Sequence, residues 1–169
     1  MNSKQVVAVV GLVALLIIIV YPALSISSTS VLVRSTKISK ADHVYVTVGN
    51  MWAHRLGQSS SEGWELISNE SQTVDLVTLA ESTTTLGKGS LSVTKYDMIR
   101  IDISNVTWVY NKTSSKLQVE TTELPANVEF TVVAGKESVI TLVLTGHQEE
   151  ISGTKFFMAQ LNATLTESS

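Results

Sequence analysis

The sequence contains no cysteine and few charged residues. The lack of cysteine excludes a disulfide scaffold, a thiolate metal site, a cysteine nucleophile and a lipid-modified cysteine. Charged residues make up 16% of the chain, against about 25% in an average soluble domain. The net charge is −3 and no basic run occurs. Because phosphate contacts need clustered Lys and Arg, no nucleic-acid partner is expected.

Hydroxyl side chains are abundant instead. Ser and Thr together make up about a quarter of the chain. Low charge combined with many hydroxyls is typical of an extracellular β-protein, in which solubility comes from hydroxyl groups and attached sugar rather than from ions.

The stretch Val6 to Leu24 is apolar and carries no charge, and it follows a short polar head containing Lys4. A run of about 18 or more apolar residues is long enough to span a bilayer. A basic start, an apolar helix and then small polar residues are the order of an export signal. The protein is therefore expected to be extracellular, at the cell surface.

Three fates of this segment remain open. In the first, a signal peptidase cleaves between Ser25 and Ile26. In the second, the segment is retained as an anchor, so that residues 6–24 contact the membrane and the rest faces outward, because a positive flank stays inside. In the third, the helix is kept as in a type IV pilin-like subunit. The predicted organisation is residues 1–25 as signal or anchor, 26–40 as an N-terminal strand, and 41–169 as a β-sandwich domain.

Alternating apolar residues predict strands throughout the remaining chain. Within Lys95 to Tyr110, the apolar set containing Ile99 has the opposite parity to the set containing Val106, so a bulge or tight turn is expected near Ser104. A second bulge is expected at Gly49–Asn50. The other predicted strands are Thr29 to Ile38, Val44 to Ala53, Trp64 to Ile67, Leu117 to Glu120, Phe130 to Val132, Val139 to Leu144 and Phe156 to Leu165.

Turn signals indicate how these strands connect. Ser82 to Thr85 is predicted to be a loop, and Pro125 is predicted to break the chain. Ala134–Gly135–Lys136 is expected to join two strands in a hairpin. Val139 to Leu144 is apolar on both faces and is predicted to be a central strand. Nine to eleven short strands predict an all-β fold, an antiparallel immunoglobulin-like or prealbumin-like β-sandwich preceded by the hydrophobic export helix.

Four blocks of the sequence carry a family resemblance. They are HVYVTVGNMWAHR from His43, GWELISNESQTVDLVTL from Gly63, SVTKYDMIRIDISNVTW from Ser92 and FTVVAGKESVITLVL from Phe130. In order and spacing they resemble the domain of unknown function 4382 family. This resemblance implies an exported β-sandwich protein, immunoglobulin-like or prealbumin-like, without an established enzymatic activity or catalytic residues. Where the family usually has a Thr-Asp-Ala-Pro turn, this chain has Ser35–Thr36–Lys37–Ile38.

The organisation is also similar to that of subunits of archaeal surface threads. Those subunits link head to tail, each giving its N-terminal strand to the next. By this similarity the chain is expected to be a structural or adhesive protein of the cell surface. It would be the subunit of a pilus-like filament, and its partner would be another copy of itself. The strand after the signal would enter the next copy by β-augmentation. The assembly residues would be Val31, Leu32, Val33 and Ile38. The alternative is a monomeric surface module that binds carbohydrate or an envelope protein.

Four Asn-X-Ser/Thr sequons predict N-linked glycans behind an export signal. The acceptors are Asn69, Asn105, Asn111 and Asn162.

No catalytic constellation is recognised, so no enzyme activity, cofactor or metal is expected. His43, His54 and His147 lack the spacing of metal ligands. Trp52 and Trp64 flank a predicted hairpin and are expected to form a shared core cluster. A sugar-stacking platform that includes Trp108 is the alternative.

Overall fold

The computed structural model describes residues 25–166 of the chain. The predicted export helix and the tail after Thr166 lie outside these residues. Within the described part, no helix is long and apolar enough to cross a membrane.

The described residues form ten strands and one short 3-10 helix, which confirms the all-β prediction and the expected number of strands. In chain order they are β1 (Ile26–Ser35), β2 (His43–Arg55), β3 (Trp64–Ser68), β4 (Gln72–Asp75), η1 (Thr78–Ala80), β5 (Thr84–Ser92), β6 (Lys95–Tyr110), β7 (Thr113–Val119), β8 (Glu123–Thr131), β9 (Ser138–Ile151) and β10 (Thr154–Thr166).

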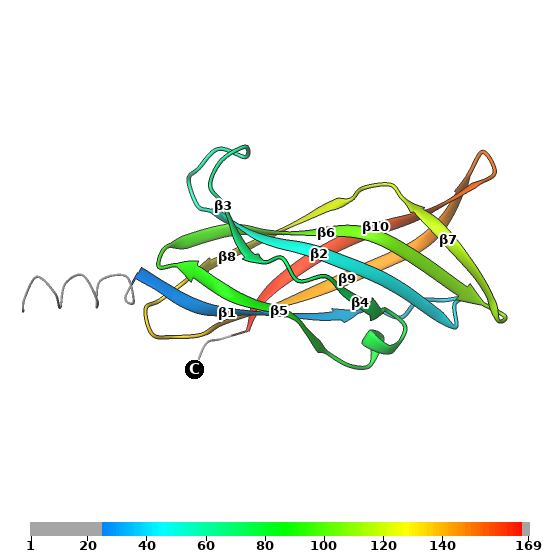
Figure 1. Cartoon of the computed structure of the whole chain (residues 1–169), viewed down its shortest axis with the longest axis horizontal. Coiled ribbons are helices and arrows are strands. Elements are labelled where there is room, and N and C mark those ends of the chain that lie inside the picture. The colour runs from blue at the N-terminus through cyan, green and yellow to red at the C-terminus, as the bar shows by residue number, and fades with distance from the viewer. Residues whose placement is uncertain (1–24, 167–169) are drawn as a thin grey trace, which may run out of the picture.

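The strands form one curved sheet in the order β3-β2-β6-β7-β10-β9-β1-β5 (Figure 1), with β4 added to β2 and β8 to β6. Neighbours are antiparallel, except that β1 runs parallel to β9 and β7 runs parallel to β10. The sheet is nearly closed and resembles an elongated barrel, so the two separate sheets of the predicted sandwich are not confirmed. The difference arises at β7, which pairs with β6 at residues 113–117 and with β10 at Gln118 and Val119.

The two predicted bulges are confirmed. In the β2–β6 ladder the register shifts between Thr47 and Val48, where Asn105 and then Ile103 are the partners, so Ser104 is skipped. A further shift lies between Val48 and Met51, at Gly49–Asn50. The bulge at Ser104 keeps both apolar sets of β6 facing inward: Ile99 and Ile101 before it and Val106 and Trp108 after it are all buried. One extra residue thus lets a 16-residue strand keep its core face despite the parity change.

A single apolar core fills the barrel. It includes Val31 and Val33 of β1, alternate residues of β2, β6, β8 and β9, and Phe157 of β10, all nearly inaccessible to solvent. β9 lies between β10 and β1, which confirms the central position predicted for Val139 to Leu144.

Three predictions about connections were wrong. Pro125 does not break the chain; it lies within β8 opposite Arg100, with its side chain exposed. Among the described strands β8 pairs only with β6, so its other edge is free and tolerates a residue without an N–H group. The segments around Ala134–Gly135–Lys136 form no hairpin, because β8 pairs with β6 whereas β9 pairs with β1 and β10. Residues 84 and 85, assigned to a loop, begin β5.

Candidate functional site

A groove of about 720 Å³ lies at the end of the barrel opposite the start of β1. β1 begins at Ile26 and runs along the barrel for ten residues, or about 33 Å at a usual strand rise. The chain then enters the groove wall at Lys37. We call this feature the distal groove. Its lining residues are Lys37, Ile38, Ser39, Lys40, Trp108, Tyr110, Asn111, Thr113, Ser115, Gly146, His147, Gln148 and Lys155.

The distal groove forms because paired strands diverge at this end. β7 meets β10 only at residues 118–119, so residues 113–117 of β7 pair with β6 alone. β9 pairs with β1 only as far as Leu144, so its continuation pairs with β10 alone. Two strand edges therefore border the groove: one edge of β7 at residues 113–117 and one edge of β9 beyond Leu144. Neither edge has a strand partner among residues 25–166. Backbone N–H and C=O groups on such edges are free to bond a ligand or water.

Aromatic rings and turns shape the groove. Trp108 is 7% exposed and donates its indole N–H to the carbonyl oxygen of Lys40 at 3.1 Å, which fixes the β1–β2 loop above it. Tyr110 is 47% exposed. The next two residues, Asn111 and Lys112, have φ values of 48° and 62°, the signature of a two-residue type I′ hairpin turn. The β6–β7 turn is thus tight and places Asn111 at the rim.

The groove is locally positive in a chain whose net charge is −3. Lys37, Lys40 and Lys155 line it together with His147, and none of its lining residues in the described part of the chain carries a carboxylate. None of the three lysines forms an ion pair within residues 25–166. In the β9–β10 ladder, Glu150 opposes Lys155.

A second feature lies on the outer face of the sheet, where Trp52 and Trp64 meet Arg100. The guanidinium carbon lies 5.7 Å from the ring centroid of Trp52 and 4.8 Å from that of Trp64. Both rings are only partly buried and lie outside the core. The two rings do share one contact, the guanidinium of Arg100. The prediction that Trp52 and Trp64 form a core cluster is nevertheless wrong, because the two rings lie on the outer face of the sheet. The cause is the bulge at Gly49–Asn50, after which Met51 and Ala53 point inward and Trp52 points outward.

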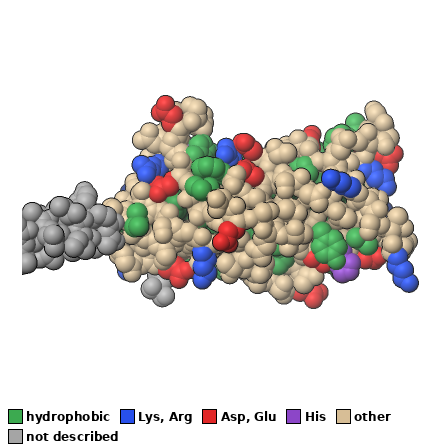
Figure 2. Space-filling model, in the orientation of Figure 1, with side chains coloured by type: hydrophobic (Ala, Val, Ile, Leu, Met, Phe, Trp, Pro, Cys, Tyr) green, Lys and Arg blue, Asp and Glu red, His purple; other side chains and the backbone are tan. Residues whose placement is uncertain are grey.

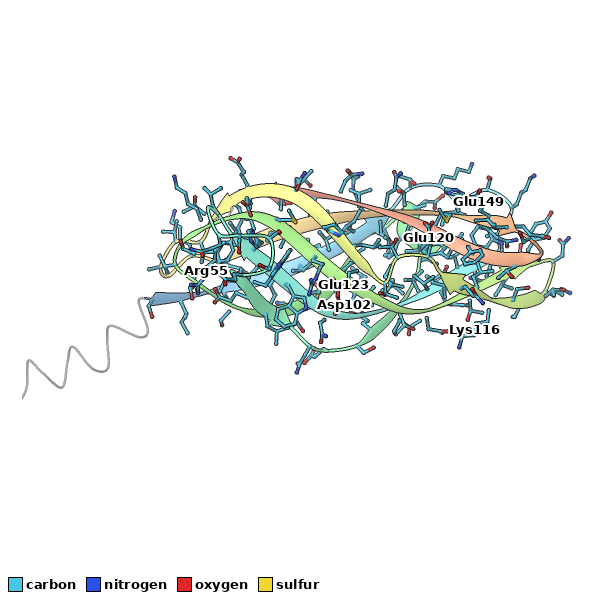
Figure 3. All side chains as sticks on the ribbon, turned by 90° about the horizontal axis from the view of Figure 1, so that it is seen from above. Arg55, Asp102, Lys116, Glu120, Glu123 and Glu149 are labelled. Carbon is cyan, nitrogen blue, oxygen red and sulfur yellow. The ribbon has the colours of Figure 1, made fainter. Side chains whose placement is uncertain are left out.

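Acidic side chains hold Arg100 over these rings. Its Nη1 donates to Oε2 of Glu123 at 2.9 Å, and its Nε lies 3.8 Å from Oδ1 of Asp102. Figure 3 shows Asp102 and Glu123 side by side, on β6 and β8. Exposed Leu66 opposes Trp52 in the β2–β3 ladder and extends the patch. Figure 2 shows hydrophobic side chains gathered among charged ones below the β2–β3 loop.

His54 anchors the β2–β3 loop. Its side chain is buried, with Nδ1 2.7 Å from Oδ1 of Asp97 and Nε2 2.9 Å from the carbonyl oxygen of Ser59. A carbonyl and a carboxylate both accept hydrogen bonds, so we assign the ring as an imidazolium that donates from both nitrogens. The hydrogen bond to Ser59 and then that to Asp97 raise the pKa of His54, although burial opposes them.

Near the start of β1, Glu65 ties four strands together. Its carboxylate accepts hydrogen bonds from the backbone and hydroxyl of Ser92, from the hydroxyl of Tyr96 at 2.7 Å and from Arg55. Burial raises the pKa of Glu65, but these hydrogen bonds outweigh it and leave that pKa below its usual value. The hydrogen-bond partners of Glu65 lie on β2, β5 and β6, so we assign this cluster the structural role of linking these strands to β3.

The sequons lie in different settings. Asn69 is exposed in the β3–β4 loop, Asn111 is exposed in the β6–β7 turn, and Asn162 is exposed on β10. Asn105 is partly buried within β6, and its Oδ1 is buried without a hydrogen-bond partner. Three acceptors are thus open to solvent, whereas Asn105 is less accessible.

The residues predicted for strand donation and cleavage lie at β1. Val31 and Val33 are fully buried, Leu32 is partly buried, and all three pair with β9 and β5 of the same chain. Ile38 lies beyond the end of β1 and lines the distal groove. Ile26 is the first residue of β1, and the carbonyl oxygen of Ser25 accepts a hydrogen bond from the N–H of Val93.

The histidines are separate from one another, as their spacing predicts. His43 contacts Asp75, His54 contacts Asp97, and His147 lies in the distal groove. Within the described part of the chain, no three His, Asp or Glu side chains are grouped closely enough to hold a metal ion.

The sequence predicted the individual strands but not the distal groove. Its lysines come from the β1–β2 loop and from β10, and the widest separation, between Lys37 and Lys155, is 118 residues. A weak signal was present in Lys37 and Lys40, two lysines that flank Ile38–Ser39 shortly after the end of β1.

Comparison with known proteins identifies one family. The model of a domain of unknown function, DUF4382, matches residues 28–149. No curated protein and no solved structure matches the chain. The family match ends within β9, whereas β10 pairs with β9 along its whole length and completes the sheet.

Proposed function

The chain belongs to the DUF4382 family, and from this and from the organisation of the chain we propose that it is an exported protein of the cell surface with a structural or adhesive role. The observation that carries the proposal is the position of β1. The sheet begins at Ile26, with only Ser25 between it and the apolar segment that ends at Leu24. An export or anchor segment joined to a rigid domain without a linker would place the domain directly outside the membrane.

The site supports a binding module rather than an enzyme. The distal groove faces away from the end at which the chain would leave the membrane, and it offers cations, an exposed tyrosine and hydroxyl groups. Exposed sequons at Asn69, Asn111 and Asn162 fit N-linked glycans on such a surface protein. We also propose that the two curved halves of the sheet, one around β2 and β6 and one around β1 and β9, derive from an immunoglobulin-like or prealbumin-like sandwich whose edges meet at β7.

Protease shaving of intact cells tests the surface location. Trypsin added outside is expected to remove the β domain while cytoplasmic proteins stay intact. Intact-mass analysis of the untreated protein separates a chain that begins at Ile26 from one that keeps residues 1–25. Full resistance to protease in intact cells, with digestion only after lysis, would contradict the proposal.

A second candidate function is a filament that assembles by strand donation. The observation in its favour is that β1 lies between two strands, parallel to β9 and antiparallel to β5. Withdrawal of β1 would open a slot with two free edges, and the β1 of another copy would fit that slot in the same register. Val31 and Val33 would then fill the same core positions in the next subunit.

A disulfide between β1 and β5 distinguishes the two functions. Ser28 and Ser90 are directly opposed in the ladder and both are exposed. Opposed residues of antiparallel strands lie at a separation that a disulfide spans, and the chain has no other cysteine. The double variant Ser28→Cys, Ser90→Cys, oxidised on the cell surface, is expected to run as a monomer on a non-reducing gel. A ladder of oligomers would instead establish strand donation. Ser28→Cys combined with Ser82→Cys, which is not opposed to Ser28, controls for random cross-linking.

A further inference from the structure

We propose that the distal groove binds an acidic saccharide, a sugar chain bearing carboxylate or sulfate groups. The inference rests on the proposed surface function and adds a ligand class to it. Three observations carry it: the charge of the lining, its exposed aromatic ring and the volume of the groove.

The charge of the groove selects an anion. Lys37 and Lys40 approach from the β1–β2 loop and Lys155 from β10, and His147 joins them from β9. The absence of any lining carboxylate leaves the three lysines without ion pairs within residues 25–166. Charge-assisted hydrogen bonds to an anion are stronger than those between neutral groups. An anionic ligand therefore gains contacts here that a neutral one does not.

The remaining lining selects a sugar rather than a bare ion. Tyr110 is 47% exposed and offers an apolar ring with a hydroxyl at its tip, which suits a sugar with an apolar C–H face and a polar rim. Ser39, Thr113, Ser115 and Gln148 add neutral donors and acceptors. The groove contains no arginine, the side chain best suited to the bidentate binding of phosphate.

The dimensions agree with an oligosaccharide. Ligand pockets usually range from about 300 to 1,000 Å³, and the distal groove has about 720 Å³. Figure 3 shows that Lys116 and Glu149 lie toward this end of the barrel and Arg55 toward the other, so the groove is remote from the end where β1 begins. On a surface-attached protein this position faces outward, toward polymers of the envelope or of a neighbouring cell.

The sequon at Asn111 gives the ligand two sources. Asn111 lines the groove, so a glycan attached there would begin at its rim. The saccharide is then either the protein's own Asn111-linked glycan or a polymer from outside. Both present the same chemistry to the three lysines.

Calorimetric titration of the full chain in detergent tests the proposal, using protein from a host that does not glycosylate. The probe is tetragalacturonate, and the neutral control is galactotetraose. Tetragalacturonate is expected to bind, and galactotetraose is expected to bind at least tenfold more weakly. Added salt is expected to weaken the binding of tetragalacturonate, because salt screens its attraction to the lysines. The triple variant Lys37→Gln, Lys40→Gln, Lys155→Gln is expected to lose at least tenfold in affinity.

Matched variants make the result specific. Lys88→Gln, Lys95→Gln, Lys136→Gln changes the net charge equally at exposed lysines outside the groove and is expected to bind normally. Tyr110→Ala is expected to weaken binding and Tyr110→Phe to retain most of it. The proposal is overturned if the two triple variants bind equally, if tetragalacturonate does not bind, or if a tetraglutamate peptide binds as tightly, which would indicate an acidic protein partner. These failures leave the protease-shaving result, and hence the surface function, unaffected.

Two variants of Thr113 then identify the source of the saccharide. Thr113→Val removes the Asn111 sequon and Thr113→Ser keeps it. The affinity of each variant for tetragalacturonate is measured on protein from the native host and on protein from the host that does not glycosylate. The second set shows the effect of losing the Thr113 hydroxyl alone. Tighter binding by Thr113→Val only in the native host supports an own glycan that occupies the groove. Equal changes in both hosts support an external polymer.

Discussion

Gly89 on β5 packs directly against the carbonyl group of Ile67 on β3. A Cβ atom added at Gly89 would lie 1.7 Å from that oxygen, far inside van der Waals contact. β3 and β5 are the two ends of the strand order, so this contact lies where the barrel nearly closes. Because Gly89 has no side chain, β5 can approach β3 this closely.

Gly89→Ala is expected to destabilise the protein by about 1–3 kcal/mol, the usual cost of overpacking. The obstacle is a backbone atom, which cannot move aside as a side chain does. The matched control is Gly49→Ala, whose added Cβ would lie 3.8 Å from its nearest neighbour and meet only ordinary contacts. Urea denaturation of the two variants in parallel measures the difference. Equal stability would show that β3 and β5 do not approach each other this closely in solution.

His54 is expected to make the stability of the protein depend on pH. Its pKa is raised above the ordinary value of 6.5 because the ring donates to Ser59 and Asp97. The folded state therefore holds the proton more tightly than the unfolded state does. The stabilisation is fully present below pH 6.5 and is lost as the pH rises through the folded pKa.

Thermal melts across this range test the expectation. His54→Gln should flatten the pH dependence, whereas His147→Gln, at an exposed position in the distal groove, should leave it intact. Glu65 and Asp75 have lowered pKa values, so the stability that they contribute is lost only as the pH falls into the acidic range and is constant across the range in which His54 titrates. An unchanged slope in His54→Gln would contradict the assigned imidazolium.

Arg100 is expected to hold the β2–β3 hairpin through Trp64. A cation over an aromatic ring contributes about 0.5–1 kcal/mol at an exposed site and more where water is excluded. Arg100→Leu is therefore expected to cost about 1–2 kcal/mol, including the loss of the bond to Glu123. It is also expected to alter tryptophan emission, because Trp52 and Trp64 lose a shared neighbour. Arg34→Leu, at an exposed arginine of β1, is the control and is expected to change neither property.

The sequons are expected to be occupied unequally. Asn69, Asn111 and Asn162 are exposed, whereas Asn105 is partly buried inside the longest strand. Glycopeptide mass spectrometry of protein from the native host should find glycan on the exposed acceptors and little on Asn105. Thr164→Val, which removes the Asn162 sequon, should lower the mass by one glycan, whereas Thr164→Ser should not. Full occupancy of Asn105 together with bare exposed sites would contradict this expectation.

Local pattern was sufficient for the features of this protein that depend on neighbours along the chain. The parity change between Ile103 and Val106 required a bulge at Ser104, because side chains alternate strictly between the faces of a strand. The continuous apolar run Val139 to Leu144 required a strand with neighbours on both sides. The spacing of His43 and His54 along one strand was enough to predict that their side chains do not meet.

Tertiary structure alone decided which strands meet and what they enclose. The hairpin expected around Gly135 did not form, because β8 pairs with β6 whereas the next strand in the chain, β9, pairs with β1 and β10. Pro125 was compatible with β8 only because that strand has a free edge. Trp52 was displaced to the outer face by a bulge two residues away, and there it meets Arg100, which also contacts Trp64 of β3. The distal groove brings Lys37 to Lys155 through the divergence of β7 from β10, and such long-range pairing leaves no trace in the local alternation of apolar and polar residues.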